Sequence, residues 1–148
     1  MGVTIEGVYH FAVSVASIEA SIAWYKQVLG FELLVRDEIP GIDVKSAHMK
    51  GYGIGLELFE AKVAAPLPEY RKFPNTDLKV HGNKHLSLSI SSRERCKHEL
   101  EALGVNIVMT ADVWGTYGIF INDPTGNLIE LFEGDMEKVK EEYDKHKK

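Results

Sequence analysis

The sequence predicts an α+β fold made of two copies of a βαβββ module, and three repeated features carry this prediction. The tetrapeptide Glu-Leu-Phe-Glu occurs at residues 57–60 and again at 130–133, which is an offset of 73 residues. Tyr9-His10-Phe11 matches Lys84-His85-Leu86 at an offset of 75, and the Leu-Gly pair at 29–30 recurs at 103–104 at an offset of 74. Because the three offsets agree in order and in size, they indicate an internal duplication.

The first module is expected over residues 7–60. Apolar and polar residues alternate from Val8 to Val15, as in a half-buried strand, with His10 on the small, polar face. A helix is expected next, because Ser17 suits an N-cap and Gly30 suits the left-handed position after a helix. Further strands are expected at about 31–37, 43–50 and 52–60.

The second module is expected over residues 82–134 with the same order of elements. Residues 83–90 alternate in the same way and again place a histidine, His85, on the polar face. A helix over about 92–103 would end at Gly104, and Asp123-Pro124-Thr125-Gly126 has the composition of a tight turn. The remaining strands are expected at about 105–110, 114–121 and 127–133.

The two modules together make one domain spanning residues 1–148. Residues 61–81 hold three prolines and show no periodicity, so we interpret them as the linker between modules. Residues 135–148 are rich in both charges and are expected to form a solvated or fraying helix.

The composition bears on the binding partners and the cellular location of the protein. A formal net charge of −5 argues against nucleic acid as a partner, and no apolar run is long enough to span a membrane. The chain has one cysteine, Cys96, and hence no intrachain disulfide, and no basic segment near its start that would indicate a signal peptide. A cytoplasmic location is therefore expected.

The duplication singles out His10, Glu57, His85 and Glu130, which occupy matching positions in the two modules. A carboxylate in the middle of an apolar strand is costly unless its charge is compensated. Two imidazoles and two carboxylates could together bind one divalent ion, and Ni, Co, Zn, Mn and Fe all accept such ligands. A single strand histidine is more often an ordinary polar residue, so the prediction depends on the repeat; Glu60 and Glu133, at strand ends, are expected to be solvated.

These residues lie in segments that resemble the vicinal oxygen chelate superfamily, which includes glyoxalase I, bleomycin-resistance proteins and extradiol dioxygenases. The similar segments cover most of residues 7–134: His10 in the first strand, residues 24–31, Lys84-His85 and residues 123–131. The resemblance implies paired βαβββ modules whose sheets curl around a metal site, a small-molecule substrate and a homodimer.

The four candidate ligands indicate a branch of this family. Glyoxalase I-like lyases and isomerases use two His and two Glu, whereas the dioxygenases have no ligand at the position of Glu57. The resemblance therefore favours a lyase or isomerase, glyoxalase I- or epimerase-like, that chelates neighbouring substrate oxygens and stabilises an enediolate. Glu130 is expected to be the base, with Glu57 as its symmetric partner. The alternatives are an Fe(II) extradiol-type dioxygenase and a protein that binds or confers resistance to a small molecule such as an antibiotic.

Substrate-binding residues are not predicted. Bacterial glyoxalase I carries an Arg that holds glutathione at the position of Ser14, so that contact is not expected here. Four cations are candidates for contacting an anionic substrate: Arg71, Lys72, Lys79 and Lys84. His81 is interpreted as an exposed loop residue, and His48, on the third predicted strand, is not expected to belong to the site.

Overall fold

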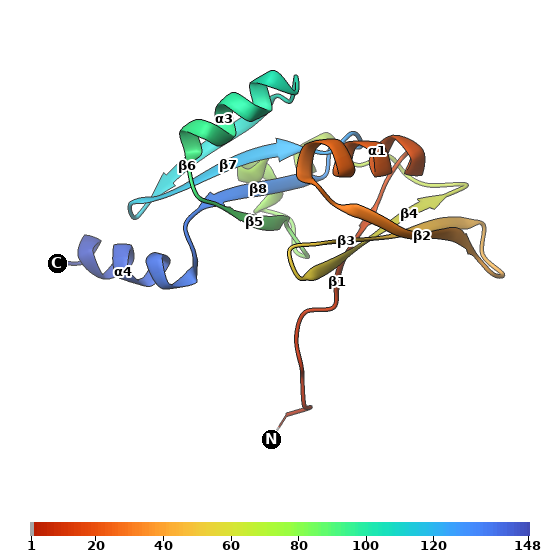
Figure 1. Cartoon of the computed structure of the whole chain (residues 1–148), viewed down its shortest axis with the longest axis horizontal. Coiled ribbons are helices and arrows are strands. Elements are labelled where there is room, and N and C mark those ends of the chain that lie inside the picture. Colours follow the sequence, from red (N-terminus) through yellow and green to blue (C-terminus); the bar gives the residue numbers. More distant parts are fainter. Residues whose placement is uncertain (1) are drawn as a thin grey trace. The chain divides into compact units, whose positions relative to one another are not determined.

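The computed structural model describes residues 2–148, which form two compact units. The first unit ends at Pro66 and the second spans Leu67–Lys148, so each is described by itself. Across the described residues 2–148 there are two four-stranded sheets, one in each unit, and each sheet is accompanied by helices (Figure 1). The predicted α+β class and the two βαβββ modules are therefore confirmed.

In the first unit the strand order is β1-β4-β3-β2, with β1 parallel to β4 and the other pairs antiparallel. Helix α1 packs on β3 and β4. It is capped as the sequence predicts, by the Ser17 side chain at its start and by Gly30, at φ +73°, after its end. The elements are β1 (His10–Ser14), α1 (Ile18–Leu29), β2 (Glu32–Ile39), β3 (Val44–Gly51) and β4 (Ile54–Ala61).

The second unit repeats this topology as β5-β8-β7-β6, with β5 parallel to β8. Its strands and main helix are β5 (Leu86–Ile90), α3 (Arg93–Ala102), β6 (Ile107–Val113), β7 (Thr116–Asn122) and β8 (Leu128–Glu133). Before them lie a 3₁₀ turn η1 (Glu69–Arg71) and a short helix α2 (Pro74–Asp77), and after them α4 (Met136–His146). The duplication read from the sequence is thus a duplication of strand order and direction.

The last glutamate of the repeated Glu-Leu-Phe-Glu motif has a structural role. It caps the helix of its own unit: Glu60 Oε2 accepts the Ile18 backbone N–H at 2.6 Å, and Glu133 Oε1 accepts the Arg93 N–H at 3.3 Å. Glu60 also pairs with Lys45 at 2.9 Å, and its side chain is 22% exposed. The expectation that these two carboxylates are merely solvated is therefore wrong, since each satisfies an N–H that a helix start leaves free.

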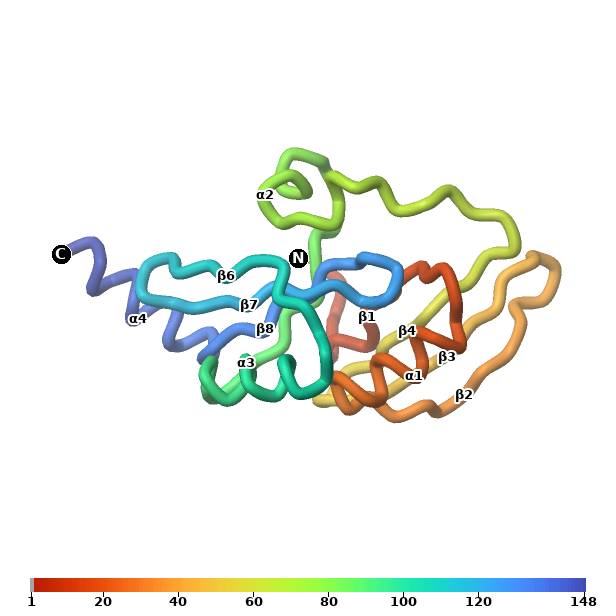
Figure 2. Tube along the Cα trace, turned by 90° about the horizontal axis from the view of Figure 1, so that it is seen from above, coloured from red at the N-terminus to blue at the C-terminus, as the bar shows by residue number. Residues whose placement is uncertain are grey.

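Most of the predicted linker beyond Pro66 is tied into the second unit. The carboxylate of Asp77 is 2% exposed and lies 2.9 Å from Arg71 Nε and 3.4 Å from Lys84 Nζ. Lys84 also donates to the Asp77 backbone carbonyl at 2.7 Å, which fixes the short helix α2 seen in Figure 2. Two of the four candidate anion-binding cations thus serve a buried internal carboxylate, and a third, Lys72, pairs with Glu69.

The charged C-terminal segment forms helix α4, whose first turn is capped by Asp135. Tyr143 packs edge-on against Trp114 of the β6–β7 turn at a ring-centroid distance of 5.4 Å, so this helix is attached to its unit through an aromatic contact. None of the helices between residues 2 and 148 is long and apolar enough to cross a membrane.

Candidate metal centre

The first pair of candidate ligands lies on neighbouring parallel strands. His10 begins β1, Glu57 lies in the middle of β4, and His10 Nε2 is 3.3 Å from Glu57 Oε2. The register places Gly55 beside His10, where an added Cβ would lie 3.0 Å from the His10 Cβ. The glycine therefore lets the histidine lie close against β4. The Glu57 side chain is 14% exposed and that of His10 is 32% exposed.

The second pair repeats this arrangement in the other unit. His85 immediately precedes β5, Glu130 lies in β8, and His85 Nε2 is 3.2 Å from Glu130 Oε2. The Phe120 ring packs edge-on against the His85 ring at 5.1 Å. The hydrogen bond from His85 lowers the pKa of Glu130, with a smaller contribution from Ser87, against the opposing effect of burial.

The structure thus brings the four predicted residues together as two His–Glu pairs, one within each unit. In the part of the chain from residue 2 to 148, no group of three or more His, Cys, Asp or Glu side chains is arranged to hold a metal ion. His81 is exposed, as expected, and Ser14 is exposed at the end of β1.

His48, which the sequence does not assign to the site, also contacts Glu57. Its Nε2 lies 3.1 Å from Glu57 Oε1, on the side of the carboxylate away from the His10 contact. In the β3–β4 pairing His48 is directly opposite Glu57. The signal was available in principle, because both residues fall on one face of adjacent antiparallel strands, but it requires the register of the hairpin, which alternation alone does not give.

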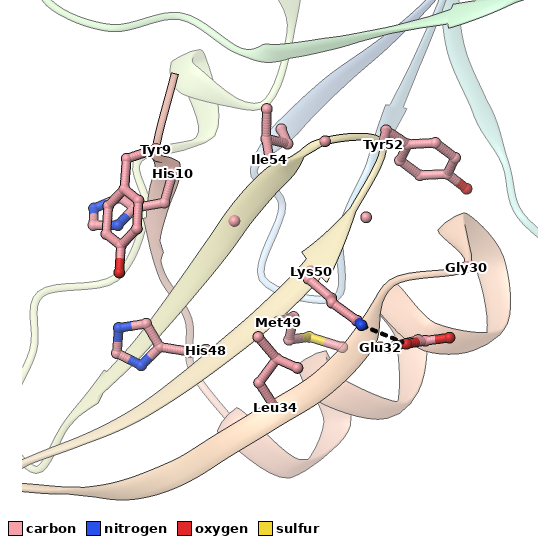
Figure 3. Close-up of a pocket in the computed structure, with 13 residues that line it drawn as sticks. Tyr9, His10, Gly30, Glu32, Leu34, His48, Met49, Lys50, Tyr52 and Ile54 are labelled. Atoms are coloured by element: carbon pink, nitrogen blue, oxygen red, sulfur yellow. Dashed lines mark ion pairs between the residues drawn. The ribbon is translucent and has the colours of Figure 1, made fainter. Parts of the chain in front are cut away.

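A groove of about 630 Å³ lies within the first unit, and His10 and His48 are among the residues that line it. Figure 3 shows Tyr9 and His10 along one part of its wall, His48 nearby, and Tyr52 at another part. Lys50 and Glu32, 3.5 Å apart, offset each other's charge on the lining. The rest of the lining comes from small and apolar residues: Gly30, Leu34, Met49, Gly51, Gly53, Ile54 and Gly55. The groove thus exposes two imidazoles amid mostly uncharged surroundings.

A family model for the glyoxalase/bleomycin resistance protein/dioxygenase superfamily matches residues 7–131. The chain belongs to this superfamily. A protein named glyoxylase I 4 from Arabidopsis thaliana is 30% identical over 125 residues, which are 82% of this chain and 67% of that protein. A protein named metallothiol transferase FosB from Staphylococcus haemolyticus is 29% identical over 137 residues, covering 90% of this chain and 87% of that protein.

Solved structures agree on the fold. A glyoxalase family protein from Enterococcus faecalis superimposes with a TM-score of 0.73 at 24% identity, covering 86% of this chain and 98% of that chain. At this level of identity the likeness concerns the fold. It agrees with the paired modules, whose strand order is the same in both units.

Proposed function

We propose that this protein is a divalent-metal-dependent lyase or isomerase whose ion is held by His10, Glu57, His85 and Glu130. The observation that carries the proposal is that the two His–Glu pairs occupy repeat-related positions with nearly the same geometry, at 3.3 and 3.2 Å. Two unrelated surface pairs have no reason to obey the symmetry of a duplication.

The donor set and its spacing fit a divalent ion. Imidazole nitrogen and carboxylate oxygen bind such ions at about 2.0–2.2 Å, so neighbouring ligand atoms lie roughly 3.0 Å apart in an octahedral shell and roughly 3.4 Å apart in a tetrahedral one. The observed separations of 3.3 Å at His10–Glu57 and 3.2 Å at His85–Glu130 fall within this interval. Ni, Co, Zn, Mn and Fe are all compatible with these donors.

The chemistry follows from the residues around the ion. When bound, a divalent ion polarises neighbouring substrate oxygens and makes the adjacent C–H more acidic. We assign Glu130 as the base that accepts this proton: its Oε2 faces His85, while its Oε1 lies over Gly118, where an added Cβ would be only 2.6 Å away. The missing side chain at residue 118 thus gives this oxygen its room. Glu57 is the symmetric partner that could return the proton from the other side.

A second candidate function is the modification of a small molecule such as an antibiotic by thiol transfer. The similarity to the protein named metallothiol transferase FosB, over 90% of this chain, favours it. The two candidates differ in the co-substrate, because thiol transfer consumes a low-molecular-weight thiol, whereas proton transfer within one substrate consumes none.

We further propose that the protein acts as a homodimer in the cytoplasm, as the superfamily resemblance implies. Leu34 and Val35 of β2 are 56% and 57% exposed in the isolated chain, which is compatible with a covered edge. Sedimentation equilibrium tests this: a mass of one chain, 16.6 kDa, at micromolar concentration would contradict it.

The reaction type is tested by proton exchange. The metal-loaded protein is incubated in D₂O with candidate α-hydroxy and α-keto compounds, free and as thiol adducts, and deuterium incorporation next to the carbonyl is followed by NMR. Glu130→Gln should abolish exchange, whereas Glu101→Gln, at an exposed position on α3, should retain it. Exchange that survives Glu130→Gln contradicts the assignment of the base. A product that carries the thiol sulfur on a new carbon–sulfur bond, formed without deuterium exchange next to a carbonyl, supports the second candidate.

A further inference from the structure

The two glutamates of the candidate centre are each held by a donor besides the paired histidine. Glu57 uses both oxygens: Oε2 faces His10 at 3.3 Å and Oε1 faces His48 at 3.1 Å. A carboxylate only accepts hydrogen bonds, so His48 can serve Glu57 as a donor only when its Nε2 carries a proton. With its side chain 14% exposed, Glu57 has little contact with water and depends on these partners.

In the second unit, the additional donor to the glutamate comes from the other neighbouring strand, β5. Phe120 of β7 is opposite Glu130 and offers no donor, but Ser87 of β5 is also opposite Glu130 and hydrogen-bonds to it. In the first unit the position that matches Ser87 is Ala12, which has no donor, and the position that matches Phe120 is His48. The imidazole and the hydroxyl therefore take equivalent roles from opposite sides of their glutamates.

His48 differs from the predicted ligand His10 in two respects. His10 has a counterpart, His85, at the repeat-related position, whereas the counterpart of His48 is a phenylalanine. In addition, His48 contacts the oxygen of Glu57 that does not face His10. An imidazole that contacts one oxygen of a carboxylate restricts the rotation of that group, so the other oxygen, here the one that faces His10, would stay in position for a metal ion.

We propose that His48 is a positioning residue for Glu57, with the role that Ser87 has for Glu130. The inference rests on the proposed metal centre and adds a residue of that centre that the repeat alone does not identify. Removal of a hydrogen-bond partner of a ligand typically weakens metal binding by about 10- to 100-fold. We expect a loss of this size for His48→Phe, which inserts the residue found at the matching place in the second unit.

A serine at position 12 should restore the donor that His48→Phe removes. Ala12 is exposed, so a serine there needs no repacking, and the double variant Ala12→Ser with His48→Phe recreates the arrangement around Glu130. His48→Gln keeps an N–H donor without the imidazole. His98→Phe, an equal change at an exposed position of α3, is the matched control. The His48 side chain is 43% exposed, so none of these changes empties a core.

The experiment titrates Co²⁺ into each metal-free, full-length variant by calorimetry and records the visible absorption of the complex. We expect wild-type affinity in His98→Phe and near wild-type affinity in His48→Gln. We also expect a 10- to 100-fold loss in His48→Phe and a recovery of most of that loss in the double variant. The ring ¹⁵N spectrum of the metal-free protein should show a protonated His48 Nε2 whose signal shifts in Glu57→Ala.

The results distinguish a failure of the metal centre from a failure of the positioning role of His48. If the wild-type protein binds no stoichiometric Co²⁺, Ni²⁺, Zn²⁺, Mn²⁺ or Fe²⁺, the metal centre itself is wrong. If it binds Co²⁺ and His48→Phe binds equally well, the positioning role is wrong. A loss in His48→Gln as large as that in His48→Phe, without rescue by Ala12→Ser, would make His48 a direct ligand and would also overturn the role proposed here.

Discussion

The capping of α1 by Glu60 yields a quantitative prediction. Glu60→Ala removes the acceptor of the Ile18 N–H, a 2.6 Å hydrogen bond at the first residue of the helix, and the 2.9 Å pairing with Lys45. Loss of a side-chain cap at a helix start costs about 0.5–2 kcal/mol. The removed group is charged and lies at the positive end of the helix dipole, which adds about 0.3–1 kcal/mol. We therefore expect a destabilisation of about 2 kcal/mol.

The repeat supplies a graded comparison. Glu133 makes the equivalent contact to Arg93, but at 3.3 Å and with a side chain that is 30% exposed, so Glu133→Ala should cost less, about 1 kcal/mol. Glu101→Ala, on the exposed face of α3, is the matched control and should change the free energy of unfolding by no more than about 0.5 kcal/mol.

Urea unfolding followed by far-ultraviolet circular dichroism measures these differences at constant slope. The predicted order of destabilisation is Glu60→Ala, then Glu133→Ala, then the control. Equal small effects for all three would refute the reasoning, because they would mean that the second carboxylate of the repeated motif is indeed only solvated.

Further predictions concern pH, the glycine beneath Glu130 and the buried carboxylate of the second unit. The pKa of Glu60 is lowered by the Ile18 N–H and by Lys45, so its stabilisation is present above the ordinary carboxyl value of 4.5 and is lost as the pH falls through the lower folded value; the difference in unfolding free energy between wild type and Glu60→Ala should therefore shrink on acidification below about pH 4.5 and not grow. Gly118→Ala would place a Cβ 2.6 Å from Glu130 Oε1, so we expect weaker metal binding in a titration, while Gly7→Ala, where an added Cβ meets nothing within 4 Å, should leave binding unchanged. Asp77→Asn leaves Arg71 and Lys84 without their buried counter-charge and should lower the urea-unfolding free energy by about 3 kcal/mol; retained stability would show that the linker ion pairs are dispensable.

Much of the fold could be predicted because the duplication marks the elements twice. The predicted Ser17 and Gly30 caps are confirmed, as is the alternation that places His10 on the more exposed face of β1. Residues 67–81 could not be predicted in this way. Their order depends on the contacts of Asp77 with Arg71 and Lys84, which become neighbours only after folding, so the sequence shows a proline-rich stretch without periodicity.

Some residues of the candidate site could likewise be predicted from the sequence and others could not. The four repeat-related residues could be found from sequence because symmetry selects them, and the structure brings them together as two pairs. His48 could not be found, since it breaks the symmetry: the second unit has Phe120 in its place. The capping role of Glu60 does not follow from the sequence for a related reason, because it depends on where the start of α1 lies relative to the end of β4.

The metal centre that we propose consists of His10, Glu57, His85 and Glu130, and metal stoichiometry tests it most directly. Purified protein loaded with Co²⁺, passed over a desalting column and analysed by mass spectrometry should retain one ion per chain, and His10→Ala and His85→Ala should each retain almost none. Two ions per chain, or one ion retained after loss of either histidine, would show that the pairs act independently and would contradict the account.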